Sequence, residues 1–190
     1  MKEKIRQILS QRERKSIFED SLTPAAVLIS LYQNEQGYHI LFTKRTQRVE
    51  YHKGQISFPG GAYESGDKAL ETTALRETFE EIGVKAEDVE ILGQLDDFQT
   101  FSSNFVISPF VATIPYPYEF RISKDEIEEL IEVPVLALLD TNNFTEDCRV
   151  YKDRIAPIYF YEYGGHIIWG ATSRILKQFL DLIRGEVLSP

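Results

Sequence analysis

The chain has 190 residues, 43% of them apolar, which suffices for one sizeable core but not for two comfortable domains. Thirty acidic residues against twenty-one basic ones give a formal net charge of -9, which disfavours contact with nucleic-acid phosphates over most of the surface. Because the chain has a single cysteine and neither an apolar run of about 18 residues nor a secretion-type leader, we expect a cytoplasmic protein without a disulfide, a membrane partner or a nucleic-acid partner.

Apolar periodicity and turn residues predict a mixed α/β chain with no internal repeat or linker. Helices are expected where apolar residues recur every three or four positions, and strands where short apolar runs are bounded by glycine, proline or polar residues. In chain order, the expected elements are a helix in 1–15, strands at 26–32 and 38–43, a helix from 65–67 to 83, strands at 89–95 and 105–114, a helix at 124–132, a helical turn at 135–139, a hairpin of 155–161 with 166–169, and a helix at 171–183. We treat 1–190 as one domain, with 1–20 as a helical N-terminal extension.

A glycine-rich turn precedes the first long helix of this domain. In Pro59-Gly60-Gly61 the backbone can turn tightly at the end of an apolar stretch. The helix is expected to begin near residues 65–67, whose short polar side chains can cap free amides. It is expected to end at Gly83, which tolerates the left-handed conformation. The turn therefore lies close to the start of the helix in sequence.

Three glutamates lie within a turn and a half of this helix. At about 100° per residue, one stripe of the helix is apolar and the roughly opposite one is acidic. The apolar stripe contains Leu75, Phe79 and Ile82, and the acidic one contains Glu77, Glu80 and Glu81. Like charges at this spacing repel by a few tenths of a kcal/mol per pair in water, so we expect a cationic group nearby.

The residues alone leave two interpretations of the acidic stripe. A solvated helix face explains most Glu-Glu runs. The alternative is a cation site, because carboxylates, a backbone carbonyl of the Pro59-Gly60-Gly61 turn and water are the oxygen ligands that Mg²⁺ prefers. With one cysteine in the chain, oxygen atoms or the three histidines must hold any metal. A site for Mg²⁺ and phosphate is therefore chemically reasonable.

The segment from Arg76 to Val84 resembles the signature of the Nudix hydrolase family. That signature ends in R-E-(apolar)-x-E-E-x-G-(apolar), and only the semi-polar Thr78 departs from it. The upstream half begins at Gly61, with Asp67 where the general pattern has Glu and with one extra residue before Arg76. The resemblance implies an α/β fold, namely a Nudix-type α/β/α sandwich with a central mixed β-sheet.

Longer segments are similar to the coenzyme A pyrophosphatase subfamily of Nudix hydrolases. Its pattern, L-L-T-x-R followed by a spacer and G-x-x-x-F-P-G-G, is matched by residues 41–45 and 54–61, and similarity extends over about residues 25–180. Glu50 stands where the subfamily has arginine, and Asn104 where it commonly has glycine. Loss of an arginine–phosphate contact removes about 1–3 kcal/mol, so we expect a weaker preference for coenzyme A than in a member with the arginine.

The resemblance implies roles for the glutamates that match the family signature. Glu80 and Glu81, together with the Gly60 carbonyl, would ligate Mg²⁺ or Mn²⁺. Glu77 would ligate a further ion or orient the attacking water. In such a mechanism a carboxylate positions or deprotonates water for in-line attack on phosphorus, and no covalent intermediate is required.

Other charged residues are expected to support this site. Arg76 would pair with an acid, most simply Asp67, and so hold the loop on the helix. An additional base is expected among Glu126, Glu128 and Glu129, where many Nudix proteins place a loop carboxylate. An exposed acidic helix is an equally good interpretation of these three glutamates.

Basic residues just before the glycine-rich turn are candidates for phosphate binding. Arg45, which fits the subfamily pattern, and Lys53 would supply the positive charge that the acidic surface otherwise lacks. Arg48 is expected to be a solvated surface residue, and His52 a packed or surface histidine rather than a base. His166 and Trp169 are expected in the core or sheet. Cys148 is expected to have no chemical role.

Three functions follow from these features. The leading one is Mg²⁺-dependent hydrolysis of the diphosphate in coenzyme A or a derivative, giving a phosphopantetheine and adenosine 3′,5′-bisphosphate. A broader nucleoside diphosphate hydrolase acting on ADP-ribose or dinucleotides is the enzymatic alternative, and a non-catalytic nucleotide-binding module is the other. The intact set of Arg76, Glu77, Glu80 and Glu81 argues against the module. The expected partner is a small nucleotide like coenzyme A. These features do not decide whether the chain forms a homodimer.

Overall fold

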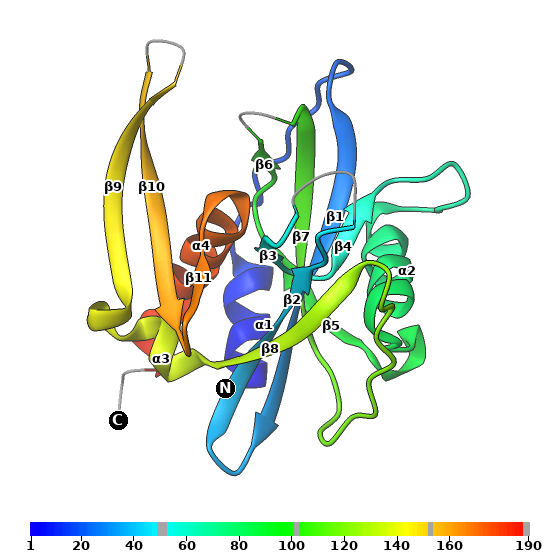
Figure 1. Cartoon of the computed structure of the whole chain (residues 1–190), viewed down its shortest axis with the longest axis vertical. Coiled ribbons are helices and arrows are strands. Elements are labelled where there is room, and N and C mark those ends of the chain that lie inside the picture. Colours follow the sequence, from blue (N-terminus) through cyan, green and yellow to red (C-terminus); the bar gives the residue numbers. More distant parts are fainter. Residues whose placement is uncertain (49–52, 101–102, 152–153, 188–190) are drawn as a thin grey trace.

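Two β-sheets, four α-helices and two short 3₁₀ helices, Ala86–Asp88 and Thr141–Asn143, make up the regular structure of this computed structural model, which describes residues 1–48, 53–100, 103–151 and 154–187 (Figure 1). The larger sheet has the strand order β3-β2-β1-β7-β5, with β4, β6 and β8 paired to β1, β7 and β2. Its strands are β1 (Thr23–Asn34), β2 (Gly37–Arg45), β3 (Ile56–Ser57), β4 (Gly60–Ala62), β5 (Glu90–Gln94), β6 (Phe98–Gln99), β7 (Phe105–Thr113) and β8 (Ile127–Pro134).

The larger sheet is mixed because β1 has neighbours of both directions. β1 pairs antiparallel with β2, as the predicted hairpin requires, and parallel with β7. The helices are α1 (Lys2–Gln11), α2 (Leu70–Ile82), α3 (Val135–Leu139) and α4 (Gly170–Val187). All four lie within or close to segments that the apolar periodicity predicts as helical. None of the helices in the described ranges is both long and apolar enough to cross a membrane.

Alternate residues of β1 face two different helical layers. Ile29 and Leu31 are buried in the cluster that contains the apolar residues of α1 and α4. Ala26 and Leu28 are buried in a second cluster, which contains Ala74 of α2. Figure 1 shows α2 on one side of the sheet and α1 and α4 on the other. The period of two along the strand therefore produces the predicted α/β/α sandwich.

A smaller sheet packs against α4. It contains β9 (Phe144–Tyr151), β10 (Arg154–Tyr163) and β11 (His166–Ile168), in the order β11-β10-β9. The predicted hairpin around residues 164 and 165 is present as β10 and β11, but β9 was not predicted. Arg174 of α4 donates to the Pro157 carbonyl at 2.8 Å, which fastens β10 to the helix.

The predicted helix at residues 124–132 is wrong. This segment enters β8, which pairs antiparallel with β2 from His39 to Arg45. Ile127, Ile131 and Val133 of β8 are buried, whereas its glutamates are exposed. Glutamate favours helices locally, but pairing along β2 satisfies the backbone of this segment and buries three β-branched side chains. Tertiary pairing thus overrides local propensity.

Candidate functional site

Helix α2 begins at Leu70, later than the predicted start at residues 65–67. Its N-cap position is Ala69, and no side chain caps it. Asp67 does not cap the helix because both of its carboxylate oxygens bind other groups. The C-terminal prediction is confirmed, since Gly83 has a φ of 75° and its N–H donates to the Phe79 carbonyl at 2.8 Å.

The predicted division of α2 into apolar and acidic stripes is only partly correct, because Ile82 is buried and Glu80 is exposed as predicted, but Phe79 and Glu81 lie on the opposite sides. Phe79 is 54% exposed, whereas Glu81 is only 1% exposed. The buried face of the helix includes Ala74 and Thr78, and the Thr78 hydroxyl donates to the Ala74 carbonyl at 2.7 Å. Small or internally satisfied side chains let the helix approach the sheet closely, and the face that does so includes Glu81. The departure of Thr78 from the family pattern is therefore accommodated within the helix.

The glycine-rich turn touches this carboxylate face. Gly60 and Gly61 in β4 pair with Val27 and Ala26 of β1. A Cβ on Gly61 would lie 2.4 Å from the Glu77 carboxyl carbon, and one on Gly60 would lie 2.3 Å from the Ala26 carbonyl oxygen. Glycine is required at Gly60, where the added atom would meet the backbone of β1, whereas at Gly61 the added atom would displace the Glu77 carboxyl group.

Arg76 and Asp67 form a closed ion pair, as predicted. Arg76 Nε donates to Asp67 Oδ1 at 3.0 Å, and Arg76 Nη2 donates to Asp67 Oδ2 at 3.1 Å. The Thr73 hydroxyl and the Glu64 N–H also donate to Oδ2, at 2.8 and 3.1 Å. These contacts, led by the arginine, hold the pKa of the Asp67 carboxyl well below its usual range. Arg76 Nη2 also reaches the Ala62 carbonyl at 3.0 Å, which ties α2 to β4.

The same guanidinium positions two of the predicted catalytic glutamates. Arg76 Nη1 donates to Glu77 Oε1 at 2.8 Å and to Glu80 Oε2 at 3.0 Å. Glu77 is largely buried, and this burial raises its pKa despite the arginine. Glu80 is about half exposed. Arg76 therefore orients the carboxylates of Glu77 and Glu80 through these two hydrogen bonds.

Glu81 is the least satisfied carboxylate of the site. Its Oε1 accepts from Arg45 Nη2 at 3.2 Å, and its buried Oε2 has no hydrogen-bond partner within the described ranges. Burial raises the pKa of Glu81 to about 8, and the nearby Glu77 adds to this, while Arg45 and the Gly60 backbone oppose it. A buried, unpaired carboxylate oxygen is costly unless a ligand completes it.

The carboxylates as they stand do not form a closed ligand cage. Within the residues that the structure describes, no three histidine, cysteine, aspartate or glutamate side chains converge as metal ligands. Arg76 and Arg45 occupy the oxygens of Glu77, Glu80 and Glu81 instead. The orphaned Glu81 oxygen and the hard oxygen donors nevertheless suit a divalent cation. The residues present therefore fit such an ion.

The structure separates the three candidate bases just before and at the start of strand β8. Glu126 is exposed but lies near enough to contribute to the raised pKa of both Glu77 and Glu81. Glu129 instead pairs with Lys44 at 3.9 Å and with His166 at 3.7 Å. Glu128 pairs with Lys44 at 2.8 Å. Only Glu126 of the three thus has an evident electrostatic link to the carboxylate cluster.

The basic candidates are placed differently from one another. Arg45 ends β2 and is engaged with Glu81 rather than exposed to solvent as a ready phosphate ligand. Lys53 is exposed beside Gly54, whose N–H donates to the Arg45 carbonyl at 3.1 Å. Arg48 is largely exposed, as predicted. Two residues singled out in the sequence, Glu50 and His52, lie outside the described residues.

The remaining candidates are peripheral. His166 lies in β11, whereas Trp169 is 44% exposed, so its expected place in the core or sheet is wrong. Cys148 is exposed on β9. Sequence reasoning missed Thr73 as a partner of Asp67, because a hydroxyl six residues away carries no signal until the helix start is known. It also missed the contact of Gly61 with Glu77, which the double glycine indicated only as a turn.

The model of the NUDIX domain matches residues 22–153, which include the glycine turn, all of α2 and Glu126. The chain belongs to the Nudix hydrolase family. Similar proteins include the uncharacterized Nudix hydrolase NudL of Photorhabdus laumondii, 30% identical over 165 residues that cover 87% of each chain. NudL of an Enterobacter species is 32% identical over 154 residues, covering 81% of this chain and 79% of the relative.

Solved Nudix structures support the fold. A MutT/nudix family protein from Enterococcus faecalis superposes with a TM-score of 0.60 at 17% identity, covering 93% of this chain and 66% of that one. An Ap4A hydrolase from C. elegans gives a TM-score of 0.51 at 18% identity, covering 60% of this chain and 82% of that one. The likeness confirms the Nudix-type sandwich as the fold of this chain.

Proposed function

We propose that this Nudix hydrolase uses a divalent cation to cleave the diphosphate linkage of a nucleotide, with coenzyme A and its derivatives as the preferred substrates. The observation that carries the proposal is Glu81, buried with one unpaired oxygen beside Glu77 and the Gly60 turn. A fold under selection for stability alone gains nothing from an incompletely paired buried carboxylate. A site that binds a cation, by contrast, needs a carboxylate oxygen that is not already paired within the protein.

Glu80, Glu81, Glu77 and the Gly60 carbonyl would hold Mg²⁺ or Mn²⁺. When bound, such an ion neutralises charge on the non-bridging diphosphate oxygens. The chain itself supplies orientation, because Arg76 fixes Glu77 through a 2.8 Å hydrogen bond and is in turn fixed by Asp67. Orientation of this kind converts a carboxylate into a group that can position an attacking water.

Proton transfer falls to the carboxylates around Glu77. As the water oxygen forms its bond to phosphorus, the phosphorus bond to the bridging oxygen breaks, and the water proton passes to a carboxylate. Glu77 and Glu126 are our candidates for this acceptor. Burial raises the pKa of Glu77, which makes it a better base than a solvated glutamate.

The preference for coenzyme A is inferred from the subfamily resemblance and from the placement of cations. Coenzyme A carries a 3′-phosphate besides its diphosphate, and an acidic protein needs a cationic contact for that group. Arg45 reaches Glu81 from the end of β2, and Lys53 is exposed next to the segment that bonds to Arg45. We propose both as phosphate ligands of a small cytoplasmic nucleotide.

A substrate panel with products identified by mass spectrometry tests this function. Coenzyme A, its 3′-dephospho form, ADP-ribose and a dinucleotide should each be offered with Mg²⁺ at concentrations below saturation. We expect coenzyme A to be cleaved faster than ADP-ribose, yielding phosphopantetheine and adenosine 3′,5′-bisphosphate. Faster turnover of ADP-ribose would favour a broader nucleotide hydrolase, and binding without products would favour a non-catalytic module.

The Glu50→Arg variant tests the source of the preference. Restoring the positive charge of the subfamily pattern should lower the KM for coenzyme A more than the KM for 3′-dephospho-coenzyme A. The matched control is Glu64→Arg, a change of the same kind at an exposed position of the loop before α2. An equal effect of Glu50→Arg on the two coenzyme forms would exclude residue 50 from the 3′-phosphate contact.

A further inference from the structure

The outer edge of β9 is open in the described structure. β9 pairs with β10 on one side, and the smaller sheet ends there in the order β11-β10-β9 (Figure 1). Residues 145–150 of β9 are all exposed. An exposed strand edge presents a row of N–H and C=O groups that can pair with another strand. The hairpin therefore offers a surface that the proposed catalytic site does not use.

Proline fixes which backbone groups face this edge. Pro157 of β10 lies opposite Cys148 and has no N–H to donate, so Cys148 and Pro157 cannot exchange the paired hydrogen bonds of an antiparallel ladder. The Cys148 N–H accordingly turns outward and donates to the Asp147 carboxylate at 2.7 Å. By the alternation of the ladder, the backbone groups of Glu146 and Val150 face the open edge as well.

This alternation restricts how β9 can pair with itself about a two-fold axis. Outward-facing residues must pair with outward-facing residues, which leaves a few registers centred on or near Cys148. With Cys148 opposite Cys148 of a second copy, Asp147 lies opposite Arg149 twice, once on each side of the axis. The neighbouring registers place Asp147 opposite Asp147 or Arg149 opposite Arg149, and like charges directly opposite are destabilising. Of these three registers, only the one centred on Cys148 is self-complementary in charge.

We propose that β9 pairs antiparallel with β9 of a second copy of this chain, with Cys148 on the two-fold axis, and so forms a homodimer. The pairing joins the two smaller sheets into one continuous sheet and converts an open edge into an interior ladder. The Cys148 N–H exchanges its bond to Asp147 for one to the opposite strand, which frees Asp147 to pair with Arg149 of the second copy.

Charge exchange tests the register. Sedimentation of the full chain from micromolar to near-millimolar concentration should show a monomer–dimer equilibrium. Asp147→Arg places two arginines opposite each other and Arg149→Asp places two aspartates opposite each other, so each variant should raise the dissociation constant about tenfold or more. Glu162→Arg, a charge reversal on β10 away from the edge, is the matched control and should dimerise like the wild type.

Mixing the two charge variants separates loss of pairing from loss of folding. Asp147→Arg and Arg149→Asp chains are complementary to each other, so an equimolar mixture should form a heterodimer with wild-type affinity. A wild type that stays monomeric throughout, or a mixture that stays monomeric while both variants keep the wild-type circular dichroism, would overturn the proposal. Nudix turnover by each variant reports on the separate catalytic proposal.

Cys148 supplies a direct probe of the axis because it is the only cysteine of the chain. A short bis-maleimide, whose two rings each add one thiol, should link two wild-type chains at protein concentrations where the dimer forms and much less at low concentration. Cys148→Pro should abolish the dimer while keeping β9 and β10 paired, since the N–H that it removes is not used by β10. A Cys148→Pro protein that dimerises like the wild type would exclude backbone pairing at this edge.

Discussion

Two buried carboxylates of this Nudix hydrolase, each paired with an arginine, differ in how completely they are satisfied. Asp67 is 6% exposed, and its two oxygens accept hydrogen bonds from Arg76, Thr73 and the Glu64 backbone. Glu81 is 1% exposed, but only one of its oxygens is bonded within the described ranges, to Arg45. The pKa of Asp67 is lowered and that of Glu81 is raised to about 8.

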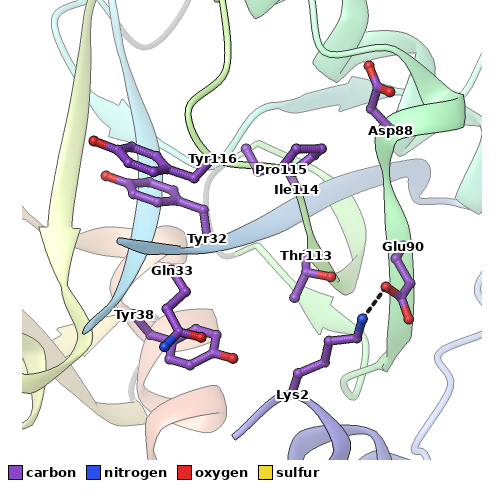
Figure 2. Close-up of a pocket in the computed structure, with 10 residues that line it drawn as sticks. All are labelled: Lys2, Tyr32, Gln33, Tyr38, Asp88, Glu90, Thr113, Ile114, Pro115 and Tyr116. Atoms are coloured by element: carbon purple, nitrogen blue, oxygen red, sulfur yellow. Dashed lines mark hydrogen bonds and ion pairs between the residues drawn. The ribbon is translucent and has the colours of Figure 1, made fainter. Parts of the chain in front are cut away.

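The difference separates a structural pair from a binding site. A charge that is fully paired fixes the fold around it, whereas a buried charge with an open oxygen destabilises the empty protein and is ready for a ligand. The open hollow of about 340 Å³ at the other end of β1 has an unpaired buried hydroxyl, that of Tyr32, but no unpaired buried carboxylate oxygen among the described residues. Its wall contains the Tyr32–Tyr116 ring stack and the Lys2–Glu90 ion pair (Figure 2). The unpaired carboxylate, rather than hollow volume, marks the proposed catalytic centre.

The Glu81→Gln substitution should have the largest effect on activity. We expect turnover of the preferred substrate to fall by about a thousandfold, because the variant lacks a charged oxygen at the proposed cation site. Its thermal midpoint should stay the same or rise, since a buried and poorly paired charge has been removed. Steady-state kinetics and calorimetry on the same preparation measure both. Parallel loss of activity and stability would instead make Glu81 a structural residue like Asp67.

The Asp67→Asn substitution should reverse this pattern. Removing the buried negative charge that accepts two hydrogen bonds from Arg76 should lower the free energy of unfolding by about 3 kcal/mol, measured by urea denaturation. Glu64→Gln is the matched control, because Glu64 meets Arg76 only at 3.8 Å and is largely exposed, so its loss should change stability by about 0.5 kcal/mol or less. Equal stability of the two variants would remove the distinction between the pairs.

In metal-free protein, Asp67 and Glu81 should make the free energy of unfolding depend on pH in opposite directions. The folded pKa of Asp67 lies below its unfolded value of about 3.9, so its contribution is complete above that pH and is lost as the pH falls toward the folded pKa. The folded pKa of Glu81 lies above its unfolded value of about 4.3, so stability is lost as the pH rises from there to about 8.

Denaturation of the wild type and the Glu81→Gln variant in chelator, from pH 4.5 to 9, measures the second dependence. Relative to the variant, the wild type should lose stability across this range and level off above about pH 8. A constant difference between the two proteins would contradict the raised pKa of Glu81.

Glu126→Gln should have the smallest of these effects. Because Glu126 acts on Glu77 and Glu81 through charge, we expect turnover to fall about tenfold, with a shift in the acidic limb of the pH profile. Glu129→Gln, whose parent residue pairs with Lys44 and His166, is the control and should keep wild-type kinetics. Equal loss in the two variants would mean that general surface charge is responsible.

Local signals sufficed for much of the fold. The apolar runs of β1 and β2, with a polar loop ending at Gly37 between them, predicted the hairpin, and Gly83 predicted the end of α2, because these features depend on residues close in sequence. Segment 124–132 was mispredicted as a helix because its partner strand β2 lies far away in sequence. β9 was missed because its residues 145–150 are all exposed, so the strand has neither an apolar run nor a buried face to reveal it.

The sequence predicted which residues form the candidate site, but not which of them are buried. The family pattern located Glu77, Glu80 and Glu81, and the resemblance also implied the ion pair of Arg76 with Asp67. The helical wheel failed because it assigned sides by hydropathy, which placed Phe79 inside and Glu81 outside. A functional carboxylate breaks the rule that charge faces solvent, so this pattern could not reveal it.

Calorimetric titration of Mn²⁺ and Mg²⁺ into the chelator-treated protein tests the central claim most directly. The wild type should bind the ion, whereas Glu80→Gln and Glu81→Gln should bind it more weakly by at least about tenfold while keeping the wild-type fold. Glu71→Gln, an exposed carboxylate in the first turn of the same helix, is the control and should bind like the wild type. Unchanged binding in folded Glu81→Gln would contradict the assignment of the cation site to this helix.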